Sequence, residues 1–392
     1  MPIGARQPGL KRAVGRARNA MVAVLLTGTL SACATDRPIA FQCTRMNEFR
    51  TEVPVTPGGP IPGVPVNDLA SVLSDAFAPR PGGAVEGPVN VVLLSGGGKW
   101  GAYGAGLLKA WSAQTELGQI RPRFDVVTGV STGALQSTFA FLGRQYDDRL
   151  IAAYTIENER QLAIRHGGSF FIRHASMADL SPLREYARKR VVPLLDEVAT
   201  EGRSGRKLFV GSIDALNGKM YAIDMTRIAD ELGGIERQEC YLGALLASAA
   251  IPVVFRQVTI NGTPYFDAGV RNSVFLAGFE TAMDKGLVSR NRTGTLWVLM
   301  NGEPGAPLKP TLPAKLLPTL GRLRELVFDQ IEQNSVFSVA IQSGLRTRVA
   351  TAQGHGCQTD ADEDIFNPAI MRCLSESGTH AYERGVPWKD YR

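Results

Sequence analysis

The chain has 392 residues, of which 44% are hydrophobic and 20% are charged, so it can bury a large core without depending on cross-links. Its formal charge of +6 arises in the first 32 residues, which hold five basic residues and no acidic one. The rest of the chain has 38 basic residues against 37 acidic ones. This balance leaves nothing in the charge of the chain to suggest a nucleic-acid surface.

The first 32 residues have the pattern of an export signal. An apolar run from Met21 to Leu30 follows the basic residues and is too short to cross a bilayer. It ends in Leu30-Ser31-Ala32-Cys33, which resembles the lipobox of bacterial lipoproteins, whose cysteine is lipidated. We expect residues 1–32 to be a lipoprotein signal peptide and Cys33 to anchor the protein to a membrane of a bacterial cell envelope, facing the periplasm or the outside. A signal peptide cut nearby, or an uncleaved anchor, is the alternative.

Residues 33–88 follow, and from Glu52 onward they are rich in proline and glycine. Such a composition does not form a packed core, so we expect an extended tether. Besides Cys33 the chain has an even number of cysteines, Cys43, Cys240, Cys357 and Cys373, and disulfides persist in exported proteins. We expect Cys357 to pair with Cys373, because both lie in a polar C-terminal segment that has little else to fix it. Free buried thiols are the alternative, and no cysteine or histidine spacing suggests a metal site.

Strand-like and helix-like segments alternate from Val89 onward. Strands are predicted from Val89 to the first glycine turn and at Phe124–Thr128, Lys207–Ile213, Met220–Ile223, Val253–Ile260 and Thr295–Met300. Helices are predicted after each glycine turn and at Ser181–Ala199 and Cys240–Ala250. This alternation indicates an α/β fold with a parallel sheet and helices on both faces. We place one domain at residues 89–350 and expect residues 351–392 to be a cysteine-containing tail packed on it.

A long amphipathic helix is predicted from about Thr319 to beyond Val339. Leu320, Leu323, Val327 and Ile331 recur in it at helical spacing. We expect this stripe to pack on the core and not to face a membrane.

Two glycine-rich turns contain the candidate chemical groups. Gly129-Val130-Ser131-Thr132-Gly133 fits GxSxG, in which small flanking residues permit a strained strand-to-helix turn that exposes the serine hydroxyl. The earlier turn, Gly96-Gly97-Gly98-Lys99-Trp100-Gly101, would let backbone N–H groups face a developing negative charge, as in an oxyanion hole. It also fits the GxGxxG of dinucleotide sites. That fingerprint requires an acidic residue at the end of the next strand, whereas Asp125 stands at its beginning.

A serine nucleophile needs a base, and Asp267 has the most suggestive context. It follows two aromatic residues and precedes two small ones, in Tyr265-Phe266-Asp267-Ala268-Gly269. The pKa of an ordinary aspartate is about 3.9, so it is a weak base, and burial would raise that pKa. No sequence context marks a histidine as catalytic among His166, His174, His355 and His380.

The order of GGG, GxSxG and a distant Asp-Ala-Gly resembles the patatin-like phospholipases over about Val89 to Val270. The segments Asp179–Leu183, Gly211–Lys219 and Ala247–Phe255 agree with it. The resemblance implies a three-layer α/β/α sandwich with a mainly parallel central sheet. It also implies a cofactor-free lipid acyl hydrolase of the phospholipase A, lysophospholipase or lipid esterase type, acting on membrane lipids or other acyl esters. Ser131 would be the nucleophile, Asp267 the base, and the backbone of residues 96–99 the oxyanion hole.

One residue departs from the family pattern. The glycine loop usually continues with a basic residue two places after the third glycine, and here that place holds Trp100, with Lys99 one place early. This departure affects the choice of substrate more than the acyl-transfer chemistry. Two other functions stay open. An α/β-hydrolase with a triad of Ser131, Asp267 and either His355 or His380 fits the chain order, and a non-catalytic envelope lipoprotein would retain the fold alone.

Overall fold

The structure, a computed structural model of the chain, describes residues 39–53, 88–166, 176–276, 294–306, 316–343, 345–358 and 365–391. The predicted signal peptide, Cys33 and His174 lie outside these residues. So does the part of the predicted tether from residue 54 to residue 87.

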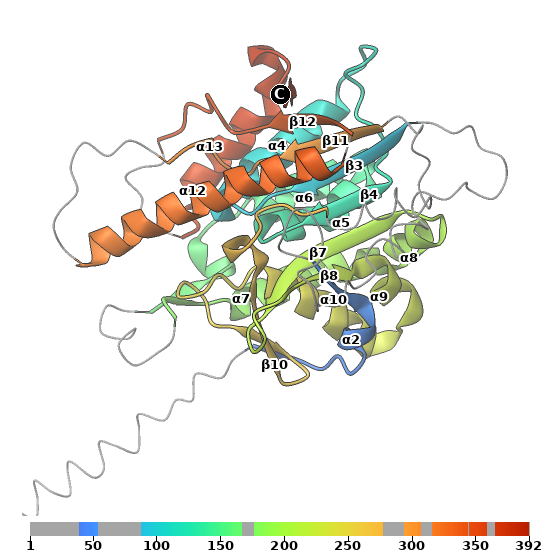
Figure 1. Ribbon diagram of the computed structural model, residues 1–392, viewed down its shortest axis with the longest axis vertical. Coiled ribbons are helices and arrows are strands. Elements are labelled where there is room, and N and C mark those ends of the chain that lie inside the picture. The colour runs from blue at the N-terminus through green and yellow to red at the C-terminus, as the bar shows by residue number, and fades with distance from the viewer. Residues whose placement is uncertain are drawn as a thin grey trace, which may run out of the picture. The chain divides into compact units, whose positions relative to one another are not determined.

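A central sheet organises the fold (Figure 1), and its five middle strands run parallel in the order β7-β4-β3-β11-β12. Their bounds are β3 (Val89–Leu94), β4 (Val126–Gly129), β7 (Lys207–Asp214), β11 (Gly294–Leu299) and β12 (Arg346–Ala350). Val91 to Leu94 are fully buried, as expected for a strand covered on both faces. The predicted mainly parallel sheet is confirmed.

Antiparallel strands extend the sheet on both sides. They are β2 (Arg50–Glu52) on β8 (Met220–Asp224), β8 on β7, β10 (Thr263–Asp267) on β7, β9 (Val258–Ile260) on β10, and β13 (Lys389–Asp390) on β12. The short strand β1 (Ala40–Phe41) runs parallel to β9, and β5 (Ile164–Arg165) pairs with β6 (Ala178–Asp179) in a separate sheet. β7 pairs with β4 through its first residues and with β10 through its last ones, so β10 ends close to the carboxyl edge of the parallel strands.

Helices cover both faces of the sheet, which gives the predicted three layers. Their bounds are α2 (Met46–Phe49), α4 (Gly101–Ser112), α5 (Thr132–Leu142), α6 (Asp147–Tyr154), α7 (Ser181–Val191), α8 (Leu195–Arg203), α9 (Met225–Glu231), α10 (Gly234–Ser248), α12 (Leu316–Ser343) and α13 (Pro368–Thr379). Alternate residues of β3 face opposite ways: Val92 belongs to the core that contains residues of α4 and α5, whereas Val91 belongs to a second core that contains Val336 and Val339 of α12. No helix among the described residues is long and apolar enough to span a bilayer.

The predicted tether is wrong for residues 39–53. These residues form β1, α2 and β2, and Phe41 and Phe49 are buried in the core. Cys43 forms a disulfide with Cys240 of α10, which ties this segment to the domain across 197 residues of sequence. The predicted Cys357–Cys373 disulfide is confirmed.

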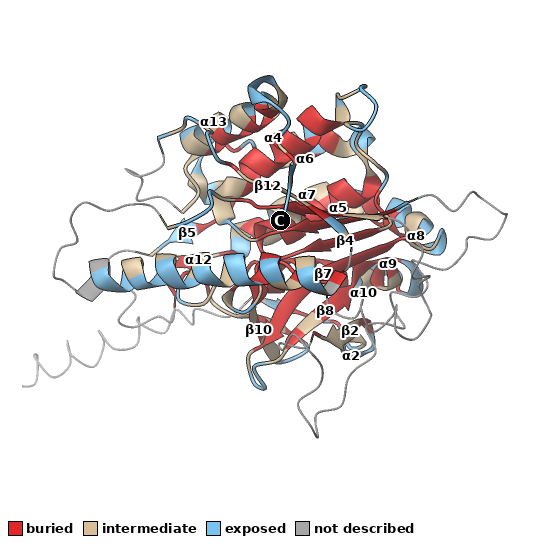
Figure 2. Cartoon of the chain, turned by 45° about the horizontal axis from the view of Figure 1, so that its top comes forward, coloured by how far each residue is buried: buried red, intermediate tan, exposed pale blue. Residues whose placement is uncertain are grey.

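Two further predictions need correction. Leu320, Leu323 and Val327 of α12 are 45–55% exposed and do not pack on the core, because the buried side of the helix is formed by its C-terminal half. Figure 2 shows this long exposed side. The strand predicted from Val253 begins only at Val258. Val253 itself has φ +72° and is exposed, because the chain turns here between the end of α10 and the sheet.

Candidate active site

Ser131 lies on a sharp turn between β4 and α5. Its backbone has φ 56° and ψ −122°, a conformation that costs a non-glycine residue on the order of 1–3 kcal/mol. The two motif glycines allow this turn. A Cβ on Gly133 would overlap the carbonyl of Leu94, and one on Gly129 would overlap the backbone of Gly133. Ser131 therefore follows β4, beside the end of β3, and stands at the N-terminus of α5, where the helix dipole favours negative charge.

Asp267 ends β10 and caps the short 3₁₀ helix η5 (Ala268–Val270). Its Oδ1 accepts a hydrogen bond of 2.7 Å from the Gly269 N–H, and a Cβ on Gly269 would lie only 3.0 Å from that oxygen. The side chain is buried, and its Oδ2 has no hydrogen-bond partner among the described residues. The Ser131 hydroxyl is the side chain that favours the ionised form of this carboxyl. Burial raises the pKa of the Asp267 carboxyl from 3.8 to about 7, against the opposing effect of the hydrogen bonds from Ser131 and Gly269.

The C-terminal end of α10 holds both of these residues. The Ser131 N–H donates to the Oγ of Ser248 at 3.0 Å, and the Asp267 N–H donates to the carbonyl of Ala250 at 3.0 Å. Ser248 is fully buried. Ser248 was not predicted as a site residue. The available signal was a lone hydroxyl in a run of alanines, Ala247-Ser248-Ala249-Ala250.

The glycine loop passes close to Ser131. A Cβ on Gly96 would lie 3.4 Å from the Cβ of Ser131, so this position has little room for a side chain. Gly97 and Gly98 have φ +147° and +55° and lead into the 3₁₀ helix η1 (Gly98–Trp100). Gly98 begins that helix, at the end where backbone N–H groups have no acceptor within the helix, so its N–H is suited to receive an anion beside Ser131.

A network of polar side chains holds the glycine loop in place. Ser95 Oγ donates to the Gly96 carbonyl at 2.8 Å and accepts from the Asn301 N–H at 2.8 Å. The Asn301 side chain bonds to Gln136 of α5 and to the Ser95 carbonyl. Glu332 of α12 lies 3.4 Å from Ser95 Oγ, and burial raises its pKa to about 7. These supporting residues come from four separate parts of the chain, which is why no local motif predicted them.

Trp100 packs against the C-terminal part of the chain. Its ring meets the ring of His355 edge to face, with the centroids 5.0 Å apart. His355 Nε2 lies 3.2 Å from Glu303, and its Nδ1 accepts from the Cys357 N–H at 2.9 Å. The residue that departs from the family pattern therefore joins the glycine loop to the segment held by the Cys357–Cys373 disulfide.

The histidines that a triad would use have other partners. His355 is held as described above, with a glutamate at its Nε2. His380 is exposed, and its Nδ1 lies 2.7 Å from Glu383. The backbone N–H of His166 bonds to the Met177 carbonyl. Among the described residues, the carboxyl whose pKa is lowered by the Ser131 hydroxyl is that of Asp267.

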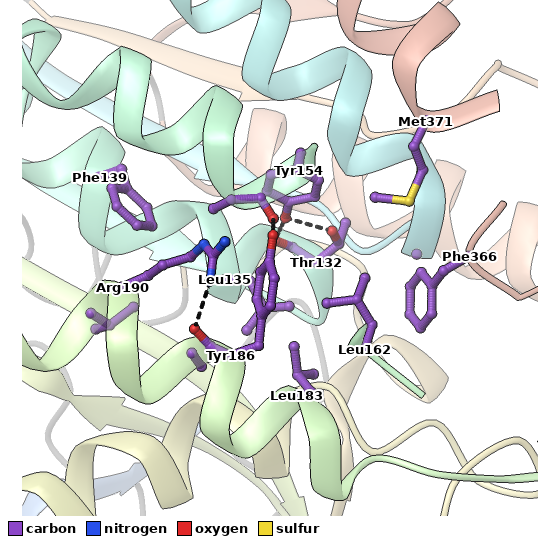
Figure 3. A pocket seen from close by; sticks show the side chains of 14 residues that line it. Thr132, Leu135, Phe139, Tyr154, Leu162, Leu183, Tyr186, Arg190, Phe366 and Met371 are labelled. Atoms are coloured by element: carbon purple, nitrogen blue, oxygen red, sulfur yellow. Dashed lines mark hydrogen bonds between the residues drawn. The ribbon is translucent and has the colours of Figure 1, made fainter. Parts of the chain in front are cut away.

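An apolar pocket opens beside the two glycine turns (Figure 3). Gly98 and Thr132 line it at the turns, and its walls come from α5, α6, α7 and α13. The apolar lining side chains are Leu135, Phe139, Ala153, Leu162, Leu183, Ala187, Val191, Phe366 and Met371. The Tyr154 hydroxyl bonds to Thr132, and the Arg190 guanidinium lies over the Tyr186 ring, 3.4 Å from its centroid. The pocket is thus suited to a hydrocarbon chain.

Comparison with known proteins gives one family. Residues 92–279 match the family model described as patatin-like phospholipase. No curated protein matches the chain. The matched residues contain the glycine loop, Ser131 and Asp267, whereas α12 and α13 lie beyond them.

Proposed function

We propose, from the premise that residues 92–279 are a patatin-like phospholipase domain, that the protein is a serine hydrolase of lipid acyl esters with Ser131 as nucleophile and Asp267 as base. The observation that carries the proposal is that the end of α10 holds Ser131, on its strained turn, together with a buried carboxyl whose Oδ2 has no hydrogen-bond partner among the described residues. Burial raises the pKa of that carboxyl to about 7. A general base acts best when its pKa is near the working pH.

The geometry supports a two-step reaction. Asp267 takes the hydroxyl proton while Ser131 Oγ attacks the ester carbonyl carbon, and the N–H groups of the glycine loop stabilise the oxyanion. The intermediate collapses to an acyl-serine, and the leaving alcohol takes the proton from Asp267. A water molecule then attacks the acyl-serine and gives its proton to Asp267. The free acid leaves as that proton returns to Ser131 Oγ.

The apolar pocket supports a lipid substrate. Its lining would receive the acyl chain, while the scissile ester lies between Gly98 and Ser131. We also propose that the N-terminal lipobox directs lipidation of Cys33 and holds the domain at a bacterial envelope membrane, where lipid esters are available. Mass spectrometry of the mature N-terminus tests this second part, because an unmodified N-terminal peptide contradicts it.

Labelling with a fluorophosphonate tests whether Ser131 is activated. We expect the wild-type chain, and the variants His166→Ala, His174→Ala, His355→Ala and His380→Ala, to react with the probe and to hydrolyse a soluble short-chain ester, because Asp267 alone acts as base. Loss of both activities in one folded histidine variant would transfer the assignment to a Ser-Asp-His triad. Absence of labelling in a folded wild-type chain would favour a non-catalytic lipoprotein.

Adjacent glycines of the loop provide a matched pair of variants. An added Cβ at Gly97 would overlap the Asn301 carbonyl oxygen, whereas one at Gly98 would meet nothing within 4 Å. We expect Gly97→Ala to lower kcat/KM for a soluble ester by roughly 100-fold or more, because the loop moves from Ser131. Gly98→Ala leaves the loop in place and should lower kcat/KM less, with a loss of about 1 kcal/mol in the free energy of unfolding because of its positive φ. Equal kcat/KM values for the two variants would contradict the assigned role of the loop.

A further inference from the structure

Helix α12 carries a stripe of exposed apolar side chains. They are Leu320, Leu323, Leu326, Val327, Phe337 and Ile341, each 45–63% exposed, and we call them the α12 stripe. Six of the fifteen large apolar side chains that are exposed among the described residues lie on this one helix. Figure 1 shows the first turns of α12 extending past the strands of the sheet. A concentration of this kind marks an interaction surface.

The opposite side of α12 contacts the loops of the candidate active site. Glu332 lies against Ser95 below the glycine loop. Ser335 Oγ accepts a hydrogen bond of 3.0 Å from the N–H of Ser273, in the loop that follows Asp267. The α12 stripe and the residues that contact the site loops therefore lie on opposite sides of the same helix.

The charges on α12 distinguish between possible partners. Its exposed positions carry apolar, hydroxyl or amide side chains and one charged residue, the cation Arg324. Glu325 is only partly exposed and lies 3.1 Å from Arg322. Asp329 is also partly exposed and accepts a hydrogen bond from Gln333. An apolar stripe beside which every carboxylate is at least partly covered fits a helix that lies in the interface of a lipid bilayer.

The size of the stripe argues against a second copy of the chain. From Leu320 to Ile341 the helix is about 32 Å long and its exposed side about 10 Å wide, an area on the order of 300 Å². A stable protein–protein interface buries about 800 Å² on each partner. A lipid surface needs no matching protein face, and insertion of a few apolar side chains is sufficient.

We propose that the α12 stripe docks the protein on a lipid surface, so that α12 lies in the interface with the catalytic loops directly behind it. This inference rests on the proposed function for its purpose, since a lipid acyl hydrolase must take its substrate from such a surface. The docking itself is a separate property and is measured separately.

The test compares two triple variants of the full chain, both with Cys33→Ala so that no lipid on residue 33 contributes. The stripe variant carries Leu323→Gln, Val327→Gln and Phe337→Gln. The control carries Leu117→Gln, Leu216→Gln and Ile235→Gln, which are 76–98% exposed but scattered over the chain. We expect the stripe variant to bind phosphatidylglycerol–phosphatidylcholine vesicles roughly 100-fold more weakly. Hydrolysis of vesicle-borne phospholipid should fall equally, and that of a soluble ester should stay within about threefold. The control should bind vesicles and hydrolyse both substrates like the parent, which is the chain with Cys33→Ala alone.

A second pair of variants reports the docking directly. Leu323→Trp should shift its fluorescence to shorter wavelength when vesicles are added, whereas Leu117→Trp should not. Parent-like vesicle binding by the folded stripe variant overturns the inference, and so does a dimer in solution that the stripe substitutions dissociate. If vesicle binding depends on the α12 stripe but the parent hydrolyses no soluble ester, the docking stands and the proposed function fails.

Discussion

Ser131→Ala is expected to leave the fold unchanged and to lower ester hydrolysis by roughly 10⁴-fold or more, because the attacking oxygen is lost. The N–H of residue 131 still donates to Ser248, and the turn keeps its backbone path. Hydrolysis of a soluble ester and labelling by a fluorophosphonate measure the loss. Wild-type labelling of the variant would place the nucleophile elsewhere.

Ser131→Gly provides the control for backbone strain. Both variants lack the hydroxyl, so both should be inactive, but glycine adopts φ 56° without the cost that alanine bears. The free energy of unfolding of Ser131→Gly should therefore exceed that of Ser131→Ala by about 1 kcal/mol. Equal stabilities would mean that the turn stores no strain at residue 131.

The central sheet could be predicted because its strands are continuous apolar runs separated by glycine turns. Val91 to Leu94 are buried on both faces, and such a run has few alternatives. The same reasoning failed for α12, because periodicity shows that a helix has an apolar side but does not show what covers that side. It also failed for β1, which has two residues and whose place depends on a disulfide to α10.

The parts of the site that could be predicted are those within one local motif. Ser131 and the glycine loop follow β4 and β3, and Asp267 stands on its own tight turn. Ser248 and Glu332 were missed, because each comes from a helix that meets the site only after folding. Trp100 showed a departure from the family pattern, but its partner His355 lies 255 residues later in the chain.

Two carboxyl groups near the site, those of Asp267 and Glu332, have raised pKa values but different neighbours. The Ser131 hydroxyl lowers the pKa of Asp267, whereas the hydroxyl of Ser95, beside the glycine loop, donates to Glu332. Only the first contacts the proposed nucleophile, so only its ionisation should control the chemical step. This difference allows a pH profile to be assigned to one residue.

Asp267→Asn should be the most informative variant, because it changes activity and stability in opposite directions. In the wild type the rate of hydrolysis should rise as the pH increases through about 7, since Asp267 accepts a proton only when ionised. The Asn variant should lose roughly 10³-fold or more in rate, together with this rise. Glu332→Gln is the control and should keep the rise near pH 7. If Glu332→Gln abolished it, the base assignment would be wrong.

Stability should respond with the opposite sign. Between about pH 4 and 7 the folded wild type holds a proton on Asp267 that the unfolded chain releases, so its free energy of unfolding falls as the pH increases and levels off above 7. The Asn variant keeps the hydrogen bond from Gly269 but has no charge to bury. Its advantage in denaturant unfolding should be small at pH 4 and reach up to about 4 kcal/mol at pH 8. An advantage that does not change with pH would show that burial of the Asp267 charge does not set its pKa.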